Sequence, residues 1–199
     1  ESTEPKDRVL AAEAIGRSGE RAERLWVLLF DAEWTVRRAA LAAAGRLQRP
    51  EFWPQIIGEL ESPVLSATAA AALVALGERA LPEAERAFNK ADQTSRVRQR
   101  ILEIYEAVGG PRTQALLAAK LGFPDERVRA EALMALSRSG YQADAASASQ
   151  VSRTIETLVG RTAWNMSAVL DLGDDPRLAP VVRALDEEIH PRAPVVSGH

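Results

Sequence analysis

Few residues of this chain have the chemistry of catalysis. Its two histidines, His190 and His199, lie near the carboxyl end, away from any serine that needs a base and without helical spacing for a metal pair. The 199 residues include no cysteine, so disulfides and thiolate metal sites are excluded. There are two acidic pairs. Asp174-Asp175 is typical of the turn at the start of a helix, and Glu187-Glu188 is typical of a solvated helix end. We therefore expect no enzymatic activity, no cofactor-binding residue and no metal site.

Phosphate recognition is also poorly supported. Gly109-Gly110-Pro111 lacks the lysine and the spacing of a phosphate-binding loop. Arginines do recur, because Arg96, Arg98 and Arg100 are followed 31 residues later by Arg127 and Arg129, with Arg37 at the equivalent earlier place. One interpretation is a basic stripe that binds phosphate or an acidic peptide. The other is that each arginine forms an ion pair with a carboxylate in a turn, and the candidate carboxylates are Asp31, Asp92, Asp125 and Glu126. The net charge of −3 and the pI near 5.6 favour the ion pairs and argue against nucleic acid as a partner.

The elements that carry these residues follow a repeat. Glycines close Ala- and Leu-rich segments at intervals of 26, 32, 32 and 31 residues, at Gly19, Gly45, Gly77, Gly109 and Gly140. Prolines mark the following segments at intervals of 32 and 29 residues, at Pro50, Pro82 and Pro111. No strand-like alternation accompanies them. The pattern predicts an all-α protein, an α-solenoid of about five helical hairpins, although a plain helical bundle also fits the composition.

The expected hairpins can be placed along the chain. The first comprises helices over 5–19 and 20–30. The second begins with Asp31 as helix N-cap, and its second helix begins at Pro50. The third comprises helices over 64–77 and 82–91, and the fourth comprises a helix over 95–108 and the segment after Pro111. The fifth extends from Pro124-Asp125 to Gly140. Among the aromatic residues we expect Trp26 and Trp164 to be buried and Trp34 to be exposed. One of Phe52 and Trp53 should point inward.

Two segments carry a family resemblance. Val36-Arg37-Arg38-Ala39-Ala40-Leu41-Ala42-Ala43-Ala44-Gly45 and Val128-Arg129-Ala130-Glu131-Ala132-Leu133-Met134-Ala135-Leu136 resemble the first helix of HEAT repeats. The resemblance covers residues 5–140 and implies a scaffold that binds protein partners along a concave face lined by second helices. From helical phase, the outward polar positions there are Gln55, Glu59, Arg86, Asn89, Lys90, Gln114 and Lys120.

After residue 140 the repeat is lost. We expect residues 1–140 to be the HEAT-like array, 141–190 a helical cap of the same domain, and 191–199 a disordered tail. The cap would comprise a long helix over about 147–172 and a final helix from Asp175-Pro176 to Ile189, covering the apolar side of the last repeat. Removal of this cap should therefore cause aggregation or partial unfolding.

This ending carries a second resemblance. Trp164-Asn165 and Ala184-Leu185-Asp186-Glu187-Glu188 are similar to HEAT domains fused to bacterial membrane transporters of the ATP/ADP-translocase type. The resemblance implies a cytoplasmic domain tethered at the inner membrane through a larger polypeptide, and the start at Glu1-Ser2-Thr3 without methionine fits such a piece. No apolar run reaches the length of a membrane span, so direct insertion is not expected.

The expected function is that of a non-catalytic protein-interaction or regulatory scaffold. Its partner would be a protein or an adjacent domain of the same chain. Two alternatives remain open at this stage. One is a nucleic-acid-binding module resembling helical-repeat DNA glycosylases, and the other is a chromophore-lyase-like HEAT protein.

Overall fold

The computed structural model describes residues 3–143, 145–172 and 180, and every regular element in these ranges is helical. The chain divides into two compact units, Glu1–Gln142 and Ala143–His199. The all-α class expected from the sequence is confirmed for the described part. The expected final helix, with the acidic pairs Asp174-Asp175 and Glu187-Glu188, His190 and the 191–199 tail, lies outside the described residues.

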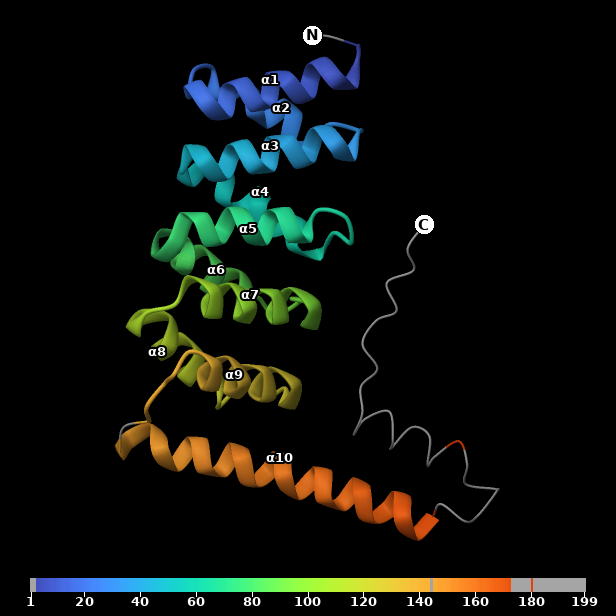
Figure 1. Ribbon diagram of the computed structural model, residues 1–199, viewed down its shortest axis with the longest axis vertical. Coiled ribbons are helices and arrows are strands. Elements are labelled where there is room, and N and C mark those ends of the chain that lie inside the picture. Colours follow the sequence, from blue (N-terminus) through green and yellow to red (C-terminus); the bar gives the residue numbers. More distant parts are fainter. Residues whose placement is uncertain (1–2, 144, 173–179, 181–199) are drawn as a thin grey trace. The chain divides into compact units, whose positions relative to one another are not determined.

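One row of helices runs through the first unit, and each helix of this row packs against the next (Figure 1). The row consists of α1 (Pro5–Ser18), α3 (Trp34–Leu47), α5 (Ser66–Leu76), α7 (Ser95–Val108) and α9 (Glu126–Arg138). The bounds expected for α7 are confirmed. Helix α5 is shorter than the expected 64–77, because the hydroxyl of Ser62 accepts a hydrogen bond from the Leu65 amide at 3.2 Å and holds the preceding residues in a turn.

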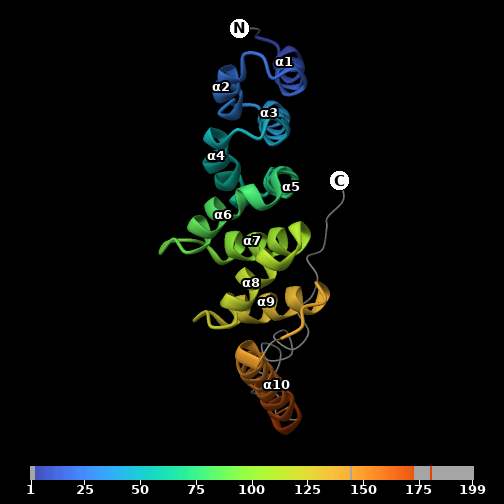
Figure 2. The ribbon, with the colours of Figure 1, turned by 90° about the vertical axis from the view of Figure 1, so that its left-hand side faces the viewer.

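Shorter helices form a second row, and each of them packs against the first-row helix that follows it in sequence. They are α2 (Leu25–Leu29), α4 (Trp53–Gly58), α6 (Leu81–Phe88) and α8 (Pro111–Lys120). Figure 2 shows the two rows side by side from α1 to α6. The prolines lie at helix starts as expected, because the first turn of a helix needs no N–H partner: Pro111 begins α8, and Pro50 begins the 3-10 turn Pro50–Phe52 before α4.

Glycines of the first row have two roles, at helix ends and at close contacts between helices. Gly19, Gly77, Gly109 and Gly140 have positive φ and lie next to helix ends, as the repeat pattern predicts. Gly45 was expected to close a helix, but it lies buried inside α3, which continues to Leu47. A Cβ atom on Gly45 would lie 2.8 Å from the Cβ of Ala72 on α5, and one on Gly16 would lie 2.8 Å from the Cβ of Ala43 on α3. These glycines therefore allow close approach between helices.

The expected N-cap of α3 is wrong by two residues. Glu33 is the N-cap residue, and the Asp31 carboxylate instead accepts the Glu33 amide at 2.9 Å in a local turn. The same carboxylate receives two hydrogen bonds from the Arg8 guanidinium of α1, at 2.7 and 2.9 Å, which lower the pKa of Asp31. A carboxylate that binds Arg8 bidentately and closes a turn joins α1 to the start of α3.

In the second unit the described element is α10 (Ala145–Leu172), a helix of 28 residues that agrees with the expected long helix. Trp164 was expected to be buried, yet it is 66% exposed. Ile155 and Met166, which belong to the expected apolar side of this helix, are also exposed, at 43% and 51%. Within the described residues, no helix combines the length and apolar character needed to cross a bilayer.

The close approach at Gly45 generates a stability prediction. Gly45→Ala places a methyl group 2.8 Å from the Ala72 Cβ and 3.0 Å from its Cα, so α3 and α5 must separate, at a cost of about 1–3 kcal/mol in the free energy of unfolding. Gly58→Ala is the matched control, because no atom lies within 4 Å of its new methyl group and alanine favours a helix by about 1 kcal/mol. Urea denaturation should show Gly45→Ala less stable than wild type and Gly58→Ala at least as stable. Equal midpoints for the two variants would contradict the packing role of Gly45.

Candidate binding surface

The arginines at the starts of the first-row helices bind the backbone of the preceding loops. Arg37 donates to the carbonyls of Asp31 at 2.7 Å and Ala32 at 3.1 Å. Arg129 donates in the same way to Phe123 at 2.9 Å and Pro124 at 2.8 Å.

Arg98 follows the same plan with a longer reach. Its guanidinium donates to the carbonyls of Phe88 at 3.1 Å and Lys90 at 3.0 Å, and it lies 5.2 Å from the centroid of the Phe123 ring. Loop carbonyls have no helical partner, so a guanidinium with several N–H groups satisfies two of them at once. Arg37, Arg98 and Arg129 therefore have structural roles.

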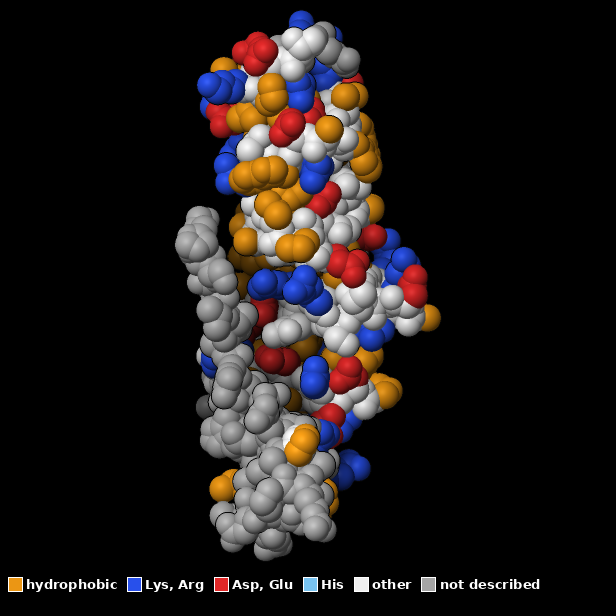
Figure 3. Space-filling view, turned by 90° about the vertical axis from the view of Figure 1, so that its right-hand side faces the viewer, with side chains coloured by type: hydrophobic (Ala, Val, Ile, Leu, Met, Phe, Trp, Pro, Cys, Tyr) orange, Lys and Arg blue, Asp and Glu red, His pale blue; other side chains and the backbone are white. Residues whose placement is uncertain are grey.

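The expected carboxylate partners only partly account for these arginines. Arg129 has a carboxylate of Glu126 at 4.0 Å, but Asp92 pairs with Lys90 at 3.7 Å, and Asp125 caps α9 by accepting the Arg127 amide at 2.8 Å. Figure 3 shows acidic and basic side chains interspersed on the face that it presents, with no continuous basic stripe among the described residues. A nucleic-acid-binding stripe is not supported there.

The polar positions expected on the second row have hydrogen-bond or ion-pair partners within the chain. Gln55 donates to Glu59 at 3.4 Å, and the exposed Arg86 pairs with Glu83 on the same helix. Gln114 donates to the Ser139 carbonyl at 3.0 Å. Whether these residues, together with Asn89 and Lys90, contact a partner stays a prediction.

Lys120 is a correction to this set, because it does not point outward. It is only 5% exposed, and its ammonium lies 2.5 Å from the Glu85 carboxylate and 4.3 Å from the centroid of the Phe88 ring. Lys120 lies three residues after the buried Leu117, and therefore on the same face of α8.

Glu85 is the centre of a polar cluster that joins α6, α7 and α8. Its carboxylate accepts hydrogen bonds from Lys120, from the Asn89 amide at 2.9 Å and from the buried Tyr105 hydroxyl at 2.8 Å. Burial acts to raise the pKa of Glu85, but these hydrogen bonds outweigh it and the net pKa is lowered. Burial and the adjacent carboxylate raise the pKa of the Tyr105 hydroxyl.

The protonation states that follow give this cluster a structural role. Glu85 remains ionised and Tyr105 remains a hydroxyl donor at neutral pH, so the three helices are held by charge-assisted hydrogen bonds. The cluster contains no nucleophile next to a free base. Nor do the described residues contain a group of three or more His, Cys, Asp or Glu side chains placed to hold a metal ion.

An apolar patch lies on α2 and the residue that follows it. Trp26, Val27 and Phe30 are 39%, 60% and 64% exposed, and the rings of Trp26 and Phe30 stack with their centroids 6.3 Å apart. The expectation that Trp26 is buried is therefore wrong, although its other side contacts the buried Phe52 at 5.4 Å. Of the remaining aromatic residues, Trp34 is exposed as expected and Phe52 is the inward member of its pair, while Trp53 is half-buried.

Sequence reasoning missed this patch, although a signal for it exists. Residues 25–29 are Leu-Trp-Val-Leu-Leu, apolar on every side of the helix. A short helix in a two-row arrangement buries one side only, here Leu25, Leu28 and Leu29, so an apolar side must remain outside.

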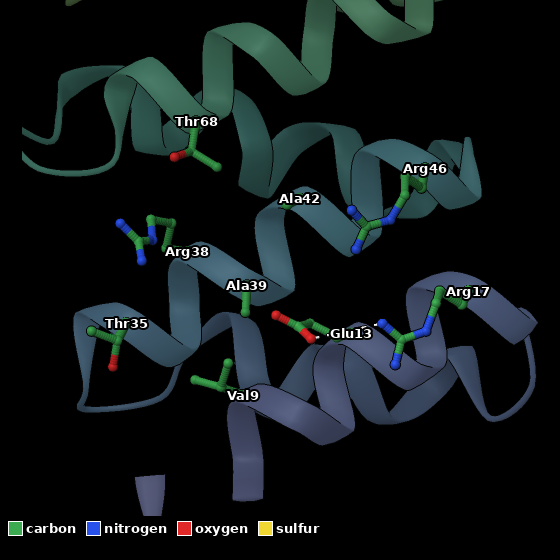
Figure 4. Close-up of a pocket in the computed structure, with 9 residues that line it drawn as sticks. All are labelled: Val9, Glu13, Arg17, Thr35, Arg38, Ala39, Ala42, Arg46 and Thr68. Atoms are coloured by element: carbon green, nitrogen blue, oxygen red, sulfur yellow. Dashed lines mark ion pairs between the residues drawn. The ribbon is translucent and has the colours of Figure 1, made fainter. Parts of the chain in front are cut away.

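A hollow of about 620 Å³ lies over α1, α3 and α5 (Figure 4). Three arginines line it, Arg17 from α1 and Arg38 and Arg46 from α3, with Glu13 as the acidic residue among its lining. Its other lining residues include Ala39, Ala42 and two threonines. This site lies on the first row and was not among the positions expected to bind a partner.

No protein-family model matches the chain, and no curated protein sequence matches it significantly. What the chain can do must therefore be argued from its own side chains. Two surface features are candidates for binding, the α2 patch and the basic hollow, while the Glu85 cluster contributes to stability.

The Glu85 cluster predicts a pH-dependent stability. Because the folded-state pKa of Glu85 is lowered, its contribution is present above the ordinary value of 4.5 and is lost as the pH falls through the folded-state pKa. Glu85→Gln should reduce the free energy of unfolding by about 1–2 kcal/mol at pH 7, allowing for partial solvent exposure, with the difference from wild type shrinking below pH 4.5. Urea titrations at several pH values measure it. The exposed Glu61→Gln is the control, and a Glu85→Gln loss that did not change with pH would argue against the ionised cluster.

Proposed function

We propose that this chain is a non-catalytic protein-interaction scaffold domain, an α-solenoid of HEAT-like hairpins that belongs to a larger polypeptide. The serial packing of each helix on the next supports this proposal, since such arrays present long surfaces rather than one enclosed pocket. Its partner is a protein or an adjacent domain of the same chain. The resemblance of residues 164–165 and 184–188 to transporter-fused HEAT domains favours a cytoplasmic position beside a membrane.

The exposed patch on α2 carries this proposal. Large apolar side chains of a folded domain are normally covered, and adjacent exposed ones mark interaction sites. Val27 and Phe30 are mostly exposed, and Trp26 stacks on Phe30 while resting on the buried Phe52. A rigid aromatic surface of this kind binds apolar side chains of a protein partner at low entropic cost.

The second row also carries the polar residues expected to bind a partner. Gln55 lies on α4, Glu59 directly follows that helix, and Arg86 lies on α6, in the row that begins with α2. The Gln55–Glu59 hydrogen bond and the Arg86–Glu83 ion pair suit the polar rim of an interface whose apolar centre is at α2.

The test is a double substitution in the full parent protein. Val27→Gln with Phe30→Gln should lower the recovery of bound proteins at least tenfold in quantitative co-purification from native cells, as expected when about 1.4 kcal/mol of binding energy is lost. The unfolding midpoint should change little, because neither side chain is buried.

Val64→Gln, at another exposed apolar residue, is the matched control and should retain the partner. A partner set that survives the double substitution but is lost on replacing Gln55 and Arg86 would move the interface away from α2. Turnover of a substrate by the purified chain, abolished by a point substitution, would overturn the non-catalytic proposal itself.

A further inference from the structure

The hollow over α1, α3 and α5 has a basic group at each end. In Figure 4, Arg38 lies at one end and Arg17 and Arg46 lie at the other, with the Glu13 carboxylate between the two ends, beside Ala39. Glu13 and Arg17 form an ion pair at 3.7 Å. Each end therefore keeps about one positive charge, and the hollow as a whole has three arginines and one glutamate, a net charge of +2 (3 − 1).

These arginines differ from others of the first unit. Arg8 and Arg138 bind Asp31 and Glu106 bidentately, whereas Arg38 and Arg46 form no ion pair with any described carboxylate. Arg38 lies 5.0 Å from the centroid of the Trp34 ring, which supports its guanidinium without neutralising its charge. The hollow thus presents two guanidinium groups, those of Arg38 and Arg46, that form no ion pair with a carboxylate of the described residues.

The floor between the two ends consists of two alanines of α3, with Glu13 of α1 beside them. Ala39 and Ala42 separate Arg38 from Arg46, and the hydroxyls of Thr35 and Thr68 lie toward the Arg38 end (Figure 4). Alanine allows a backbone to approach α3 closely, and the threonines offer hydrogen bonds to it.

We propose that this hollow binds an acidic protein segment in extended conformation, with two carboxylates four residues apart. Arg38 and Arg46 are eight residues apart on α3, about 12 Å along the helix axis. Four residues of an extended chain span about 13 Å, and side chains four residues apart point to the same side. One carboxylate would pair with Arg38 and the other with Arg46 and Arg17, and the residue midway between them would lie on the alanine floor.

Charge and spacing together favour this occupant over a small anion. A single phosphate or carboxylate engages one end and leaves the other guanidinium unpaired. The hollow lies on the first row, and binding of an acidic segment there does not depend on binding at the α2 patch.

The experiment measures peptide binding to the full chain by fluorescence anisotropy at low and physiological salt. The probe is a fluorescein-labelled, otherwise neutral peptide rich in threonine and valine, with two aspartates four residues apart. We expect saturable binding that weakens with salt and falls at least tenfold for Arg38→Gln and for Arg46→Gln. Glu13→Gln should strengthen binding severalfold, because it removes the competing carboxylate.

Arg96→Gln is the matched control, since it removes one exposed arginine on α7 that forms no ion pair with the described residues. Equal losses for Arg96→Gln and Arg38→Gln would reduce the effect to net charge and overturn the site. A peptide with aspartates two residues apart that binds equally well would overturn the spacing. Full displacement by inorganic phosphate or triphosphate at equal concentration would identify a phosphate site instead, and no binding at millimolar peptide would reject the proposal.

Discussion

The distance between neighbouring first-row helices is set where glycine faces alanine. Gly16 of α1 meets Ala43 of α3, and Gly45 of α3 meets Ala72 of α5, in each case with no room for a methyl group. Such contacts bring backbones close and fix the lateral register of the helices. The basic hollow depends on this constraint, because its two arginine-bearing helices hold their side chains at a defined separation only while the helices stay in contact. A wider spacing would remove the floor on which the proposed peptide rests.

A second constraint on this architecture is that the carbonyl groups of the loops between helices need hydrogen-bond donors, and arginine side chains supply them. Helix ends leave four carbonyls without intrahelical partners, and loops add more. Arg37, Arg98 and Arg129 each bridge two such carbonyls from the first turn of the next helix. A lysine has a single ammonium on a flexible stem and lacks the planar fork that spans two acceptors. This use accounts for three arginines that the sequence pattern alone would assign to a basic stripe. It also separates the structural arginines from Arg38 and Arg46, whose charges remain uncompensated.

Most helices could be predicted from the sequence, because the residues that start and end a helix lie close to it in sequence. Pro111 begins α8, which needs no N–H partner there, and the Asp125 carboxylate caps α9, so both helix starts are fixed by local interactions. Two of the errors arose where a distant residue decides the outcome. Gly45 resembles a helix stop until Ala72 is placed against it, and Lys120 resembles a surface residue until Glu85 lies 2.5 Å away. The basic hollow combines residues of three helices, so no linear pattern marked it. The α2 patch was predictable in principle, because an all-round apolar short helix cannot bury both sides in two rows.

The two proposed surfaces offer different kinds of interaction from the same pair of neighbouring rows. As proposed, the α2 patch would bind through its apolar area, without strong directional preference. The hollow would bind through paired charges at a fixed spacing, so that its affinity would depend on salt, discriminate between partners and accelerate their encounter. Helix α2 packs against α3, which carries Arg38 and Arg46, so the two sites lie on neighbouring helices of the first unit. A partner with an apolar helix or loop followed by an acidic extended segment could engage both, and the second contact would then form at the effective concentration set by the first. Selectivity would then depend on the length of the partner's chain between its apolar element and its acidic segment, and neither surface alone distinguishes partners by that length.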